Sequence, residues 1–226
     1  MIRKIIFTVV LSAVASFGAQ GSGIFIEGHV SRGVMGGDQL IAGVTEIYGT
    51  PVEYQYNVRY AFSAGYEQSF NKVISLRGGI GYQNVLMDAY AGTMEFDLTE
   101  NATIDEQIDR HWLTIPIDFK ATLPFGRSGV YIAIGPKASI LLSSTHTDNL
   151  NNSTDDLTDD TPRFNLAIGG NFGIEFPIAN AGHLFIESGY HQGLLDTSPD
   201  SFYKTKESEI NFLKVGFRIT LPHGKK

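Results

Sequence analysis

The feature that most constrains the fold of this chain is a two-residue alternation between residues 54 and 67. The even-numbered positions carry Tyr, Val, Phe and Ala, whereas the odd-numbered positions carry small or polar residues such as Gln, Ser, Gly and Glu. Successive side chains of a β-strand point to opposite faces, so this segment is expected to form a ribbon with one aromatic face and one small, polar face. A strand of this length with one apolar and one polar face indicates contact with lipid on its apolar side.

The same alternation returns along the chain and predicts eight strands, each of roughly the tilted length that crosses a bilayer. No apolar run approaches the length of a membrane-spanning helix. The expected strands cover residues 23–33, 54–67, 73–86, 111–123, 130–143, 163–176, 184–194 and 209–221.

The predicted connections alternate in length. Short turns are expected near residues 70–72, 124–128 and 177–182, and the long connections are residues 34–53, 88–110, 144–162 and 196–208. Outer-membrane barrels have short turns in the periplasm and long loops outside the cell. The chain is therefore predicted to be an all-β, eight-stranded, antiparallel, up-and-down transmembrane β-barrel located in the bacterial cell outer membrane.

The volume of such a barrel assigns its two faces. Eight strands enclose just enough room for side chains to fill the interior, and the many large apolar side chains of the other face would not fit there. The Gly-, Ala- and Ser-rich face is therefore expected to point inward, and the charges on it should pair because an unpaired buried charge is costly. The expected interior charges are Glu27, Arg59, Glu67, Arg77, Asp118, Lys120, Lys137, Glu175, Glu187, Lys214 and Arg218.

The first 19 residues have the pattern of a signal peptide. Arg3 and Lys4 precede a short apolar stretch and then small residues, and cleavage after Ala15, Gly18 or Ala19 is compatible with the sequence. The outer-membrane barrel would then comprise residues 20–226. The absence of cysteine excludes disulfides and thiolate metal sites, and the net charge of −7 argues against nucleic acid as a partner.

Two segments resemble a known family. Residues 112–117 (Trp-Leu-Thr-Ile-Pro-Ile) and 130–136 (Val-Tyr-Ile-Ala-Ile-Gly-Pro) are similar to the paired signature of the PorT-like outer-membrane β-barrels of Bacteroidetes and related bacteria. The resemblance implies an eight-stranded outer-membrane barrel, and one branch of that family is linked to secretion and gliding. Such barrels usually end on an aromatic residue that the insertion machinery reads, whereas here residues 221–226 follow Phe217 and Ile219.

The long connections are strongly acidic. They hold 18 of the 24 acidic residues, and only Arg110, Lys204 and Lys206 offset them. Most simply these are solvated loops, and a functional alternative is a loop-bound divalent cation that bridges to lipopolysaccharide phosphates. Residues 149–160 match a calcium loop poorly, because Thr154 replaces the turn glycine and the twelfth position lacks Glu. The candidate cation ligands are Asp155, Asp156, Asp159 and Asp160.

The sequence contains no recognisable catalytic motif. The nearest arrangement, Glu27, His29 and Ser31, should face the interior, and no HExxH, phosphate-loop or dinucleotide motif occurs. We therefore expect a non-enzymatic barrel without cofactor, with a filled lumen and acidic extracellular loops, acting as a membrane scaffold or surface-binding protein. Its expected partners are outer-membrane lipid, lipopolysaccharide, the barrel-insertion machinery and a possible protein bound to the loops. The alternatives are a component of secretion or gliding machinery, a lipid A-modifying enzyme and a narrow pore.

Overall fold

The computed structural model describes residues 22–36, 52–56, 58–91, 104–149, 151–178, 182–197 and 206–221. The predicted leader, residues 1–19, lies outside these ranges. No helix in the described part is long and apolar enough to cross a membrane. The strands are β1 (Gly23–Gly36), β2 (Val52–Tyr56), β3 (Val58–Ser69), β4 (Ile74–Ala91), β5 (Ile104–Phe125), β6 (Ser128–Asp148), β7 (Ser153–Asp156), β8 (Phe164–Ile178), β9 (Gly182–Gly193) and β10 (Lys206–Thr220).

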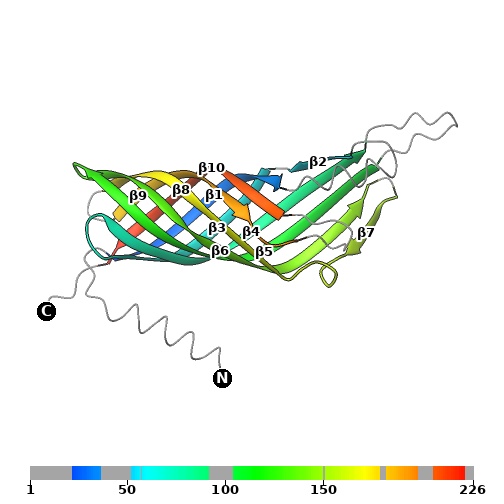
Figure 1. Ribbon diagram of the computed structural model, residues 1–226, viewed down its shortest axis with the longest axis horizontal. Helices are drawn as coiled ribbons and strands as arrows, with labels where there is room; N and C mark the ends of the chain where they lie inside the picture. The colour runs from blue at the N-terminus through cyan, green and yellow to red at the C-terminus, as the bar shows by residue number, and fades with distance from the viewer. Residues whose placement is uncertain are drawn as a thin grey trace, which may run out of the picture.

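Eight of these strands close into a barrel (Figure 1). The strands β3 to β6 and β8 to β10 each pair antiparallel with the next barrel strand, and β1 closes the ring because it pairs with both β3 and β10. The residue Ile26 shows the closure, since it lies opposite Ala64 on β3 and Phe217 on β10. The predicted eight-stranded antiparallel barrel is therefore confirmed, and closure leaves the ring without a free edge.

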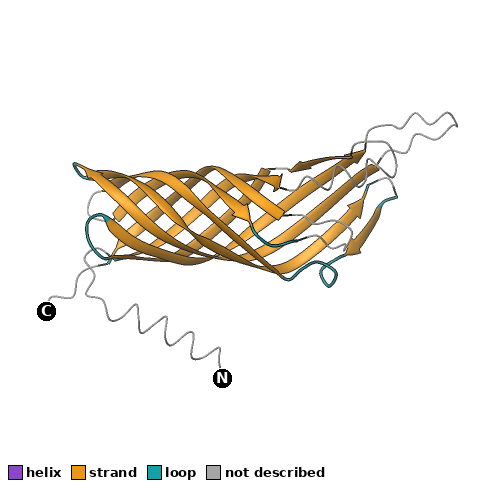
Figure 2. Ribbon diagram, in the orientation of Figure 1, coloured by secondary structure: helices purple, strands orange, loops and turns teal. Residues whose placement is uncertain are grey.

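The two ends of the barrel differ, as the view in Figure 2 shows. At one end, which we call the turn end, β3–β4 and β5–β6 are joined by tight turns. The backbone N–H groups of Val73 and Ile74 donate to Asn71 Oδ1 in the first turn, and Gly126 adopts a left-handed φ of 63° in the second. The opposite end, which we call the hairpin end, carries the extended strands and the hairpin formed by β6 and β7.

The strands extend further into the long connections than predicted. At the hairpin end β4 reaches Ala91, β5 begins at Ile104 and β6 reaches Asp148, so much of residues 88–110 and the start of 144–162 are strand rather than loop. Similarly, β10 begins at Lys206, inside the predicted connection 196–208. The strand boundaries were missed because a hairpin that rises above the lipid no longer needs an apolar outer face, and the alternation fades there.

The inside and outside of the barrel have the polarity predicted from the sequence. Large apolar side chains line the outer face, where Phe62, Leu123 and Phe172 are 60–69% exposed. The buried side chains are mostly polar or charged and point into the lumen. Phe217 is also on the outer face but is only partly exposed, whereas the side chain of Tyr56, on the aromatic face expected for residues 54–67, lies outside the described set. An apolar outer face and a polar interior are the arrangement expected of a barrel that is surrounded by lipid.

A β-bulge in β10 changes the facing pattern of that strand. The register between β1 and β10 shifts between Val30 and Ser31, so Phe212 and Leu213 are neighbours that both point outward. A bulge adds one residue to a strand, so beyond it the odd-numbered and even-numbered side chains exchange the faces to which they point. As a result the odd-numbered Glu209 and the even-numbered Lys214, which lie on either side of the bulge, are both buried in the lumen.

Candidate functional site: the charged interior of the barrel

At the turn-end side of the lumen, two cations and two carboxylates from four strands form a closed group. The Lys120 ammonium lies 2.7 Å from a Glu175 carboxylate oxygen and 3.4 Å from one of Glu67. The Arg218 guanidinium pairs with Glu67 and lies 3.5 Å from Glu175. We call these four residues the lower tier; each of its ions has partners of opposite sign on two strands.

The middle of the lumen holds a second group, which we call the middle tier. The Arg77 guanidinium pairs with Glu187 and lies 3.1 Å from Asp118 and 3.8 Å from Glu27. The Lys214 ammonium lies 3.3 Å from Glu27 and 3.2 Å from Glu187. The five side chains come from β1, β4, β5, β9 and β10, so the ion pairs connect strands across the barrel axis.

Aromatic side chains fill the space around the middle tier. The Tyr131 hydroxyl donates to Glu187 at 2.6 Å, and the Arg77 guanidinium lies 5.6 Å and 5.7 Å from the ring centres of Phe25 and Phe185. Glycine makes this packing possible, because a Cβ on Gly216 would lie 2.1 Å from the Phe185 ring. The interior is thus packed with ring, carboxylate and guanidinium groups, consistent with the limited volume inside eight strands.

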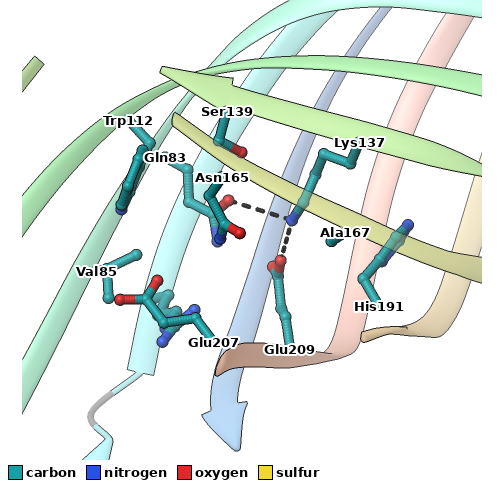
Figure 3. Close-up of a pocket in the computed structure, with 11 residues that line it drawn as sticks. Gln83, Val85, Trp112, Lys137, Ser139, Asn165, Ala167, His191, Glu207 and Glu209 are labelled. Atoms are coloured by element: carbon teal, nitrogen blue, oxygen red, sulfur yellow. Dashed lines mark hydrogen bonds and ion pairs between the residues drawn. The ribbon is translucent and has the colours of Figure 1, made fainter. Parts of the chain in front are cut away.

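The third group lies toward the hairpin end, and Figure 3 shows it in close-up. The Lys137 ammonium pairs with Glu209 and lies 3.3 Å from Gln83 Oε1. On the same tier, which we call the upper tier, His29 Nε2 lies 3.2 Å from Glu209. A small apolar cluster adjoins the upper tier and consists of Val85, Trp112 and Leu141. Next to it, Arg110 pairs with Glu207.

Two cavities lie on opposite sides of the middle tier. The cavity in the upper tier measures about 20 Å³, which is room for a single water molecule. The cavity at the turn end is larger, about 300 Å³, and its lining includes lower-tier residues and the turn cations Lys72 and Arg127. The two cavities share no lining residue among the described part of the chain, and the middle tier lines neither. Mid-height of the lumen is occupied by the middle-tier ion pairs and by the rings of Phe25, Tyr131 and Phe185.

The structure places all eleven sequence-predicted interior charges in the lumen, where the ion pairs described above connect them with one another and with Glu209. Among them, Arg59 is 2% exposed and lines the upper-tier cavity. Sequence reasoning missed Glu207, Glu209 and Arg110. The bulge at Phe212 hid the inward orientation of Glu209, and the other two were assigned to connections that prove to be strand.

The nearest sequence candidate for a catalytic site does not assemble. Ser63 Oγ donates to Glu27 at 2.7 Å, and Glu27 otherwise belongs to the middle tier. His29 instead contacts Glu209, and Ser31 is fully buried. All three side chains therefore face the lumen, and they do not contact one another in the order that nucleophilic catalysis requires.

The candidate cation ligands lie on and after the β6–β7 hairpin. Asn149, Asn151 and Asn152 lie in its turn, with Asn152 at a left-handed φ of 50°, and Ser153–Asp156 then continue as strand β7. The segment is thus a β-hairpin rather than a calcium loop, and in a strand Asp155 and Asp156 point to opposite sides. No group of three or more acidic or histidine side chains able to hold a metal occurs in the described part of the chain.

These hairpin carboxylates are exposed and make local contacts. The Thr158 hydroxyl and its backbone N–H, which lies 2.9 Å from Asp156, lower the pKa of the Asp156 carboxyl. Asp159 pairs with Arg163, four residues further along the chain. The exposed carboxylates give the hairpin end a negative surface within the described residues.

Solved structures with a similar arrangement are outer-membrane barrels of low sequence identity. Ail of Yersinia pestis, solved in complex with the heparin analogue sucrose octasulfate, is 13% identical, and the alignment covers 88% of this chain and 99% of Ail with a TM-score of 0.43. Neisserial surface protein A is 10% identical over 89% and 100% of the two chains, with a TM-score of 0.45. OprG of Pseudomonas aeruginosa is 9% identical over 91% and 97%, with a TM-score of 0.41.

Comparison with curated proteins found no match in sequence. The sequence profile of the outer membrane protein beta-barrel domain matches residues 12–198, most of the chain. This match, together with the closed ring of eight strands and its apolar outer face, means that the chain belongs to the outer membrane protein beta-barrel domain family and is located in the bacterial outer membrane.

Proposed function

We propose that the protein is a non-enzymatic membrane scaffold whose lumen is closed and whose hairpin end binds a ligand outside the cell. The single observation that carries this proposal is the continuous ion-pair network of the middle tier, which together with the surrounding rings of Phe25, Tyr131 and Phe185 occupies mid-lumen. A barrel closed in this way is poorly suited to solute passage, so the parts above the lipid are the better candidates for function.

The orientation of the barrel follows from the general layout of its family. Bacterial outer-membrane barrels have their short turns in the periplasm and their longer connections outside. On this rule the hairpin end is extracellular, and the exposed carboxylates of Asp155, Asp156, Asp159 and Asp160 would face the medium. Exposed charges of one sign attract ligands of the opposite sign over a distance of about 10 Å at moderate salt.

We favour a basic protein segment over a bound divalent cation as the ligand of this surface. The described carboxylates do not form a group that could hold a metal ion. Asp156 already accepts a hydrogen bond from Thr158, and Asp159 already pairs with Arg163. A basic segment needs only a negative surface without fixed coordination geometry. The family match does not distinguish a PorT-like branch, so a role in secretion or gliding stays a prediction from the sequence resemblance.

Titration of the protein in phosphatidylcholine vesicles with a lysine-rich peptide tests this proposal. We expect saturable binding that weakens as salt is raised, and a loss of most binding when Asp155, Asp156, Asp159 and Asp160 are all changed to Asn. The matched control changes Ser153 and Thr154, two exposed uncharged residues of the same hairpin, to Ala. Equal binding by the neutralised variant would contradict the proposal, and a parallel titration with Ca²⁺ would show whether the hairpin prefers a cation instead.

A further inference from the structure

The cavity in the upper tier lies inside the ring of strands and has mostly polar walls. Its volume is about 20 Å³, and Figure 3 shows the side chains that surround it. The residues that line it come from β3, β4, β5, β6, β8, β9 and β10. Because strands from almost the whole ring contribute to its walls, the cavity is enclosed by the barrel itself.

One wall of the cavity is formed by the indole ring of Trp112. The ring is 2% exposed and packs with Val85 and Leu141 in the apolar cluster next to the upper tier. The Nε1–H group of Trp112 is buried and has no hydrogen-bond partner among the described residues. A buried indole N–H usually finds a partner, and it can only donate. The cavity should therefore hold a group that accepts a hydrogen bond.

A second buried group lines the same cavity and needs the opposite kind of partner. Asn165 is 7% exposed, and its Oδ1 atom is buried without a hydrogen-bond partner in the described part of the chain. A carbonyl oxygen can only accept a hydrogen bond. Trp112 on β5 and Asn165 on β8 are separated by β6, so their backbones lie about 10 Å apart. One small ligand between the two side chains would satisfy both groups.

The charged side chains around the cavity favour a neutral ligand. Glu207 and Glu209 line the cavity and disfavour an anion there. Lys137 and Arg59 also line it and disfavour a cation. Two of these charges already have partners, because Glu207 pairs with Arg110 and Glu209 pairs with Lys137. A further ion in the cavity would be a buried charge without a partner of its own, which is costly.

The size of the cavity and the chemistry of its walls together select water. A volume of about 20 Å³ holds a single water molecule, and a buried water needs two to four polar partners. Water is neutral, and it can both accept from Trp112 and donate to Asn165. A chloride ion could not donate to Asn165 Oδ1, and an ammonium ion could not accept from Trp112 Nε1.

We propose that the upper-tier cavity is a hydration site for one water molecule, which accepts a hydrogen bond from Trp112 Nε1 and donates one to Asn165 Oδ1. The Lys137 ammonium supplies a further donor, since it has three N–H groups and contacts Gln83 and Glu209 with two of them. The water links β5 to β8, which are not neighbours in the sheet. The site lies on the hairpin-end side of the middle tier and does not depend on what the hairpin carboxylates bind.

Fluorescence tests this site directly, because Trp112 is the only tryptophan of the chain. Indole emission moves to longer wavelength when the N–H group bonds to water. Ala167 is 5% exposed and lines the cavity, so Ala167→Val places two more carbon atoms in the space of the water. We expect the emission maximum of the folded barrel in lipid vesicles to shift to shorter wavelength in this variant. Ala138→Val enlarges an outward side chain on β6 and should leave the emission unchanged.

Bromide distinguishes water from a halide ion, because bromide bound next to an indole ring quenches its emission. We expect no saturable quenching of Trp112 when bromide replaces chloride. In a crystal structure of the unchanged barrel grown in bromide, we expect a peak without anomalous signal about 2.7–3.2 Å from both Trp112 Nε1 and Asn165 Oδ1.

Both variants are first checked for the faster gel migration of the unboiled folded barrel. An unchanged emission maximum in Ala167→Val, or an equal shift in Ala138→Val, would overturn the proposal. Saturable quenching by bromide, or an anomalous peak in the cavity, would overturn the assignment of the ligand to water.

Discussion

Two carboxylates of this chain, Glu187 and Asp159, show how differently the same charge is used in the barrel interior and on the hairpin. The side chain of Glu187 is 0% exposed, and it contacts Arg77, Lys214 and Tyr131 from three other strands. The side chain of Asp159 is 94% exposed and pairs with Arg163 in the same segment. A buried charge is tolerated because several partners surround it, so it fixes how strands meet. An exposed charge is solvated by water and stays available to a ligand.

The largest expected loss of stability comes from removing the buried carboxylate, Glu187. In Glu187→Ala the Arg77 and Lys214 cations would lose one of their two shared partners and keep only Glu27, while staying buried. Removing one member of a buried ion pair costs about 3–5 kcal/mol, so we expect that loss in the free energy of unfolding, measured with urea in lipid vesicles. A variant as stable as the unchanged barrel would mean that water reaches the middle tier.

A smaller loss of stability is expected for a substitution on the outer, lipid-facing side of the barrel. Phe172 is 62% exposed on the outer face of β8, and a cation on the lipid face near mid-depth costs about 2–4 kcal/mol. Phe172→Arg should therefore reduce the yield of heat-modifiable barrel in a folding assay, whereas Phe172→Leu should fold normally. Normal folding of the Arg variant would place Phe172 away from lipid and invert the assignment of the two faces.

The smallest change in stability is expected when the exposed carboxylate, Asp159, is removed. Solvent-exposed ion pairs contribute about 0–1 kcal/mol, so Asp159→Ala should change the free energy of unfolding by less than about 1 kcal/mol in the same urea experiment. A loss as large as that of Glu187→Ala would show that the hairpin supports the barrel and is not a freely available binding surface.

The strand faces could be predicted from the sequence because lipid outside and limited volume inside impose a strict alternation on β3 and β8. The same rule placed Glu67, Arg77 and Lys214 in the lumen, where the structure also places them. It failed for Glu209 because a bulge is a local backbone event with no strong signature in one sequence. Arg110 and Glu207 were missed because strand ends above the lipid do not keep the alternation.

The polar contacts on the outer wall, where Asn84 donates to Asp109 and His111 lies 3.4 Å from Asp109, could not have been found by the same reasoning. Asn84, Asp109 and His111 lie on two strands and meet only through the register between β4 and β5, in which Asn84 lies opposite His111. The composition of the predicted connection 88–110 suggested a solvated acidic loop, and nothing in it separated Asp109 from its acidic neighbours. A contact that depends on strand register becomes visible only when the pairing is known.

The lumen is expected to be closed by its own side chains, and a conductance measurement tests this most directly. Purified barrel that shows the folded gel migration is reconstituted in a planar lipid bilayer, and current is recorded under voltage in symmetric salt. Because the middle-tier ion pairs and the surrounding rings occupy mid-lumen, we predict little or no current above the background of the protein-free bilayer. Stable channels of uniform, large conductance would contradict a closed lumen and indicate that the protein is a pore.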